Sequence, residues 1–176
     1  MKQVILIHGS PEPGEIATQE SITPDWFLWI QQQVPHTVIP PMPLEVEVVY
    51  NEWVTVFENY TLSPDSIIVG HSCGWGFLLR YFSEHPELRV SKIILVAPWI
   101  DPRHELGTIF MKFQIDCDFA KRNETHVFIS SDDMESIVES VAVIEQQVSG
   151  ITWHRFTDRE HFCGRQEFPE LLEILK

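Results

Sequence analysis

Five short apolar runs recur along the chain, and each is followed by residues typical of turns. They lie at 4–7, 66–69, 92–96, 126–129 and 151–156. Short runs that are apolar throughout, without an alternating polar face, are typical of strands covered on both faces of a sheet. The pattern therefore predicts five strands buried on both sides.

Helical periodicity separates several of these runs. After Gly74, apolar residues recur three and four positions apart until His85 and Pro86. Residues 136–148 and the tail 168–175 also carry apolar side chains at helical spacing. Strands that alternate with helices predict an α/β fold, a three-layer α/β/α sandwich around a mostly parallel sheet.

Two further segments are less regular. Residues 46–60 have helical spacing despite many β-branched side chains, and we expect a helix there. Residues 99–122 show no clean period, and we expect them to pass over one end of the sheet. Because no repeat or linker divides the chain, residues 1–176 are expected to form a single domain.

Composition narrows the classes of function. The 176 residues include 12 Lys and Arg against 26 Asp and Glu, a net charge of −14. No basic surface is available to neutralise phosphates, so nucleic-acid binding is disfavoured, and the same charge repels anionic membranes. We expect neither kind of partner.

The cysteines and the N-terminus indicate a compartment. The three cysteines are few and odd in number, which argues against a disulfide framework. Such sparse cysteine usage favours a reducing environment. The first apolar run has four residues, whereas a secretory signal needs roughly 7–15 and a membrane span about 18. These features predict a soluble, cytoplasmic protein.

Residues 70–74, Gly-His-Ser-Cys-Gly, match the G-x-S-x-G motif. The motif follows the strand at 66–69 and precedes a helix, the setting that a nucleophile elbow requires. In such an elbow the serine backbone is strained, and small neighbours two positions away make room for it. An ordinary serine in a glycine-flanked turn is the alternative, but strain of this kind clusters at functional sites. We therefore expect Ser72 to be a nucleophile.

A serine nucleophile needs a base, and the base needs a carboxylate. In the order Ser, Asp, His, the candidates are Asp132 or Asp133 after one strand and His161 after the last strand. All lie at the carboxyl edge of the predicted sheet, where Ser72 also lies. Asp132 with Glu135 fits a capping box, which leaves Asp133 as the triad acid.

The oxyanion formed on attack needs backbone N–H donors. One is expected from Cys73, the residue after the nucleophile, and the second from Ser10 in the loop after the first strand, with Gly9 as the next choice. Other residues near these positions could line a pocket: His8, Gly9, His71, Trp75, Trp99 and Phe162.

These stretches resemble the small serine hydrolases of the YdeN and retinoblastoma-binding-protein-like type. The similarity is carried by residues 67–72, 80–81, 94–96, 131–133, 154–158 and 161–162, and it spans nearly the whole chain. It implies a minimal α/β-hydrolase domain over residues 1–176, no cofactor, and the second aspartate of the pair, Asp133, as the acid.

The sequence departs from that family at three places. Ile137 stands where members often have proline, and the first loop is less rich in glycine. None of the cysteines lies in an L-x-C-x-E segment, so no retinoblastoma-protein partner is expected.

Two other functions compete with a hydrolase. His71-x-Cys73 and His161-x-Cys163 could supply metal ligands, but the usual zinc spacings are absent. A catalytically silent binding protein is the second alternative, because a fold alone does not set function. A complete Ser, Asp and His set favours acyl transfer from a small ester, thioester or amide to water, as in a carboxylesterase, without a metal or organic cofactor.

Overall fold

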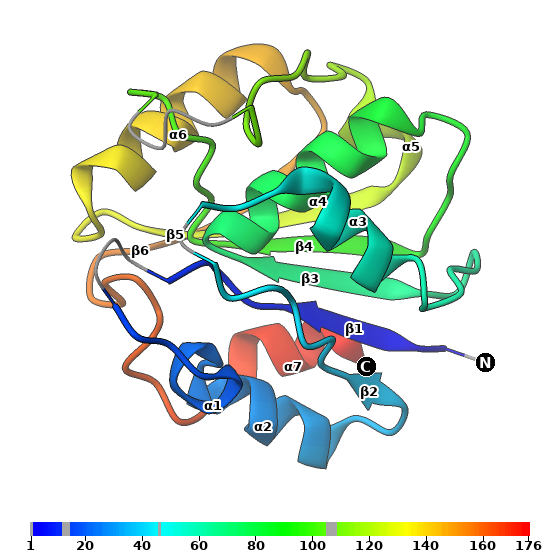
Figure 1. Cartoon of the computed structure of the whole chain (residues 1–176), viewed down its shortest axis with the longest axis vertical. Coiled ribbons are helices and arrows are strands. Elements are labelled where there is room, and N and C mark those ends of the chain that lie inside the picture. The colour runs from blue at the N-terminus through cyan, green and yellow to red at the C-terminus, as the bar shows by residue number, and fades with distance from the viewer. Residues whose placement is uncertain (1, 12–14, 46, 105–108) are drawn as a thin grey trace.

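The computed structural model describes residues 2–11, 15–45, 47–104 and 109–176. In this part of the chain, six parallel strands form one sheet in the order β2-β1-β3-β4-β5-β6 (Figure 1). The strands are β1 (Val4–Ile7), β2 (Thr37–Val38), β3 (Ile67–His71), β4 (Lys92–Val96), β5 (Glu124–Ser130) and β6 (Thr152–Phe156). The five predicted strands are confirmed, but burial on both sides is wrong for β6, an edge strand whose residues are all exposed or half-buried. The two-residue β2 adds an edge that the pattern did not predict.

Helices cover both faces of the sheet (Figure 1), as the alternation predicts. One layer contains α3 (Tyr50–Phe57), α4 (Cys73–Glu84), α5 (Phe119–Arg122) and α6 (Glu135–Gln147). The other contains α1 (Gln19–Ile22), α2 (Asp25–Gln33) and α7 (Pro169–Leu175). None of the helices in the described residues is long and apolar enough to cross a membrane.

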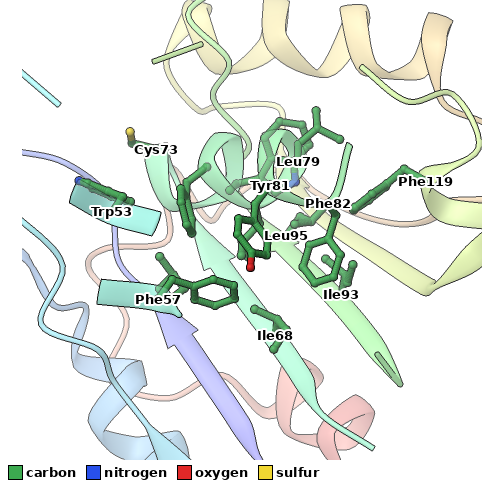
Figure 2. Packing of buried hydrophobic residues seen from close by; sticks show 14 of the residues in the cluster. Trp53, Phe57, Ile68, Cys73, Leu79, Tyr81, Phe82, Ile93, Leu95 and Phe119 are labelled. Atoms are coloured by element: carbon green, nitrogen blue, oxygen red, sulfur yellow. The ribbon is translucent and has the colours of Figure 1, made fainter. Parts of the chain in front are cut away.

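Each face of the sheet has its own hydrophobic core because side chains alternate between faces along a strand. Ile5 and Ile68 join the core beneath α3 and α4, whereas Val4 and Leu6 join the core on the α2 and α7 side. Figure 2 shows the first core, in which aromatic side chains of α3 and α4 pack over β3 and β4. Burial on both faces explains why β1, β3 and β4 are mainly apolar.

Residues 99–122 form little regular structure, as their sequence suggested. Within the described part of this segment, α5 is its only helix. The Arg80 guanidinium of α4 donates hydrogen bonds to the carbonyls of Ile109 and Phe110, each at 2.8 Å. The same group packs 3.6 Å from the centre of the Tyr50 ring. The segment is thus held against α3 and α4.

The first turn of α4 packs directly on the end of β1. A Cβ atom at Gly74 would meet the carbonyl oxygens of Ile7, at 2.7 Å, and of His8. Both are backbone atoms of a buried strand end, so neither can move without shifting β1.

We predict that Gly74→Ala lowers the free energy of unfolding by about 1–3 kcal/mol, because the added methyl overpacks this contact. Gly164→Ala is the matched control, since a Cβ there has nothing within 4 Å. It should change stability by less than about 0.5 kcal/mol. Urea denaturation of both variants measures the difference. Equal midpoints would show that the turn accommodates a methyl group at residue 74 and that the contact is not overpacked.

Candidate active site

Ser72 occupies a sharp turn between β3, which ends at His71, and α4, which begins at Cys73. Its backbone has φ 55° and ψ −123°, a conformation that side-chain-bearing residues rarely adopt. A Cβ at Gly70 would lie 3.0 Å from both the Gly74 carbonyl oxygen and the Trp75 Cα atom. The motif therefore has the predicted strand–turn–helix setting, with glycine where the turn leaves no space.

Asp133 and His161 are hydrogen-bonded to each other across 28 residues of sequence. His161 Nδ1 donates to Asp133 Oδ1 at 2.9 Å, and the Asp133 side chain is fully buried. The same oxygen accepts the Met134 backbone N–H at 2.7 Å. Because the proton is on Nδ1, His161 Nε2 is left with a lone pair that can accept a proton.

The capping role predicted for Asp132 is wrong. Helix α6 begins at Glu135, and its N-cap is Met134, with no side-chain cap. Asp132 Oδ1 instead accepts the Glu160 backbone N–H at 3.0 Å and the Ser130 hydroxyl. The Ser130 hydrogen bond is the main cause that lowers the Asp132 pKa. Asp132 therefore ties the end of β5 to the loop that carries His161.

Two further contacts fix that loop. His71 Nε2 donates to the His161 carbonyl oxygen at 2.9 Å. Burial lowers the pKa of His71 to about 3, so its imidazole is neutral. The neighbouring Phe162 is fully buried and packs against Phe156 and Phe168. The backbone of His161 is thus held from both sides.

The N-terminus of α4 and the loop after β1 meet at Ser72. The first N–H groups of a helix, including that of Cys73, have no acceptor within the helix. A Cβ at Gly9 would lie 3.0 Å from Ser72 Cβ, so the β1 loop passes close to the serine. Both Gly9 and Ser10 line the same cavity as Ser72. The Cys73 thiol itself is buried, which raises its pKa to about 12.

A cavity of about 520 Å³ opens at this edge of the sheet, with Ser72 and His161 on its wall. Trp99, Met134 and Ile137 form an apolar part of the lining. The remaining lining residues are polar and apolar side chains of mixed size: Gly9, Ser10, Pro11, Glu15, Ser21, Ile22, His71, Ser136 and Cys163. Among the described residues, no hydrogen bond joins the Ser72 hydroxyl to His161. Such contacts often tighten only when substrate binds.

Three of the six residues suggested for the pocket, Gly9, His71 and Trp99, lie on its wall. The other three, His8, Trp75 and Phe162, are fully buried and are not among the residues that line this cavity. His8 Nδ1 lies 2.7 Å from the Gly9 carbonyl oxygen and its Nε2 lies 3.0 Å from Gln19 Oε1. Trp75 packs in the core above the sheet, and Phe162 packs in the core below it.

Several lining residues were missed by sequence reasoning. Ser21 and Ile22 belong to α1, a four-residue helix too short for a periodic signal. Met134 precedes α6 and is nearly half exposed, so no apolar pattern marks it. Cys163 had a usable signal, because it lies two residues after the candidate base.

One combination of possible metal ligands comes together at this site. Donor atoms of His71, His161 and Cys163 all lie within 4.8 Å of one another. Cys73, the remaining member of the two H-x-C pairs, is buried in the core above the sheet. The structure thus unites three of the four residues that the metal hypothesis named.

Solved structures of hydrolases share this fold at low sequence identity. An esterase from Exiguobacterium antarcticum is 14% identical, with a TM-score of 0.65 over 99% of this chain and 90% of its own. Est1E from Butyrivibrio proteoclasticus is 11% identical, with a TM-score of 0.65 over 99% and 85%. A YdeN-like hydrolase from Pectobacterium atrosepticum is 17% identical, with a TM-score of 0.59 over 98% and 89%. No curated protein sequence matches the chain significantly.

A family model decides the classification. The model described as serine hydrolase matches residues 17–158, which include Ser72 and Asp133 and end before His161. That range covers most of the chain, and the structural neighbours independently give an α/β-hydrolase fold. The chain therefore belongs to the serine hydrolase family.

Proposed function

We propose that this enzyme hydrolyses a small ester, thioester or amide through an acyl-enzyme on Ser72. The observation that carries the proposal is the hydrogen bond from His161, on the wall of the cavity that holds the strained serine, to the buried Asp133 carboxylate behind it. Family membership supports hydrolysis by a serine enzyme, and this pair supports the particular triad.

Each residue has a defined role in this mechanism. Ser72 Oγ attacks the substrate carbonyl carbon while His161 Nε2 takes the hydroxyl proton. Asp133 keeps the other imidazole proton on Nδ1 and stabilises the imidazolium that forms. His161 then gives its proton to the leaving group, and a water molecule repeats the sequence to release the acid.

Backbone groups stabilise the oxyanion in this proposal. The Cys73 N–H lies at the positive end of the α4 dipole, which favours developing negative charge. Ser10 supplies the second N–H, with Gly9 the alternative in the same loop. The tight approach of this loop to Ser72 supports a donor from it.

His161 is the better base of the two histidines in the lining. The Nε2 proton of His71 is committed to the His161 carbonyl, and burial keeps that ring neutral. His71 is therefore a positioning residue, whereas His161 combines a carboxylate partner with an accessible cavity face.

The cavity favours small, neutral acyl groups. Its volume of about 520 Å³ lies within the ~300–1,000 Å³ range of small-molecule sites. Trp99, Met134 and Ile137 suit a short apolar group. Glu15 lines the cavity, and the described lining contains no Lys or Arg, so a substrate carboxylate would gain no ion pair there.

We predict that a fluorophosphonate probe labels the wild-type protein covalently and that Ser72→Ala abolishes both labelling and hydrolysis of short-chain esters. Ser131→Ala, which changes an exposed serine outside the cavity, is the control and should label normally. Intact-mass spectrometry measures the adduct. An unlabelled wild-type protein would favour a catalytically silent binding protein instead.

The adjacent aspartates provide a second prediction. Asp133→Asn should lower kcat at least about 100-fold, because the amide favours the wrong His161 tautomer. Asp132→Asn should lower the melting temperature and reduce kcat much less, because it weakens the contacts with Glu160 and Ser130 and leaves the Asp133–His161 hydrogen bond in place. Steady-state kinetics and thermal unfolding of both variants test the assignment. A larger loss of kcat in Asp132→Asn would reverse it.

A further inference from the structure

We propose that His71, His161 and Cys163 form a binding site for a thiophilic divalent cation such as Zn²⁺, and that its occupancy inhibits the hydrolase. The binding part stands on the cluster itself. The inhibitory part rests on the proposed function, because it requires His161 to be the base.

The three donors are close enough to share one ion. All lie within 4.8 Å of one another, and Cys163 Sγ is 3.9 Å from His71 Nε2. With Zn–S near ~2.3 Å and Zn–N near ~2.0–2.1 Å, tetrahedral geometry separates an S and an N donor by roughly 3.5 Å. Small side-chain adjustments therefore suffice, and the fourth position would hold water.

The surroundings suit a cation as well. The cluster lines an open cavity, and Cys163 is exposed, so an ion can enter from solvent. The net charge of −14 raises the local concentration of cations around the protein. Asp133 on His161 Nδ1 already forms the carboxylate–histidine arrangement that supports metal-binding imidazoles.

Binding would rearrange two protons. The Cys163 thiol loses its proton to solvent, and the thiolate binds the ion. The Nε2 proton of His71 moves to Nδ1, so the hydrogen bond to the His161 carbonyl is exchanged for a metal bond. No oxidant or reductant is involved.

Inhibition follows from the atom that His161 would use. Because Nδ1 is bonded to Asp133, the ion takes the lone pair on Nε2. That lone pair is the one that must accept the Ser72 proton. An occupied site therefore blocks the base without touching the serine.

The binding test uses Co²⁺ as a spectroscopic substitute for Zn²⁺ on the metal-free full chain. We expect a thiolate-to-Co²⁺ charge-transfer band that saturates at one equivalent and is abolished by added Zn²⁺. Cys163→Ser and His161→Gln should each weaken binding at least about tenfold. Cys117→Ser, which removes an exposed cysteine away from the cavity, is the matched control and should bind normally. A wild-type protein without the band, or a band retained at full affinity in either ligand variant, overturns the site.

The inhibition test measures ester hydrolysis. Zn²⁺ should suppress it in the wild type and in Cys117→Ser, a chelator should restore it, and Cys163→Ser should need at least about tenfold more Zn²⁺ for the same fractional loss. If Co²⁺ binds as expected but the Zn²⁺-loaded enzyme keeps its full rate, the inhibitory role is wrong. If the metal-free wild type neither hydrolyses esters nor labels at Ser72, the proposed function fails, while the absorption band still decides whether the metal site exists.

Discussion

The strained backbone of Ser72 is the constraint on which the rest of the site depends. A residue with a side chain at φ 55° costs on the order of 1–3 kcal/mol, and the surrounding structure must offset it. Here β3 pairs with β1 and β4 along its length, and the Ser72 N–H donates to the Val96 carbonyl at 3.0 Å. The glycines at 70 and 74 pack directly against neighbouring backbone atoms, so the first turn of α4 is held tightly against the ends of β1 and β3. The unusual backbone of Ser72 is thus held by rigid neighbours on both sides.

His161, the proposed base, is placed by a second set of constraints that begins at the end of β5. Two adjacent carboxylates make different contacts there. Asp132 accepts the backbone N–H of Glu160, and Asp133 accepts the imidazole N–H of His161. A third contact comes from His71, which precedes the serine. The proposed nucleophile and base are therefore coupled, because the side chain of His71, next to Ser72, holds the backbone of His161. A small shift of the elbow would be transmitted directly to His161.

The sequence was most informative where burial acts on both faces of an element. The strands β1, β3 and β4 are mainly apolar because helices cover both sides, and periodicity identified α4, α6 and α7. Short elements such as β2 and α1 were missed, since two or four residues contain no measurable period. Helix α3 is shorter than its pattern, covering Tyr50–Phe57 within residues 46–60. The cap expected of Asp132 failed because D-x-x-E describes local chemistry, whereas a contact 28 residues away determined its partner.

The two H-x-C pairs show why identical spacing can have different outcomes. At residues 71–73 the left-handed turn at Ser72 directs the flanking side chains apart: His71 lies edge-on to Trp26 below the sheet, and Cys73 enters the core above it. At residues 161–163 the intervening Phe162 also has positive φ, 61°, but its ring is buried, and His161 and Cys163 are left on the cavity wall. His71, at the end of β3, then meets this second pair in the loop that follows β6. The direction of each turn therefore determines which His and Cys side chains meet at this edge of the sheet. A motif such as H-x-C gives residue types and their spacing, and it contains no information on that direction.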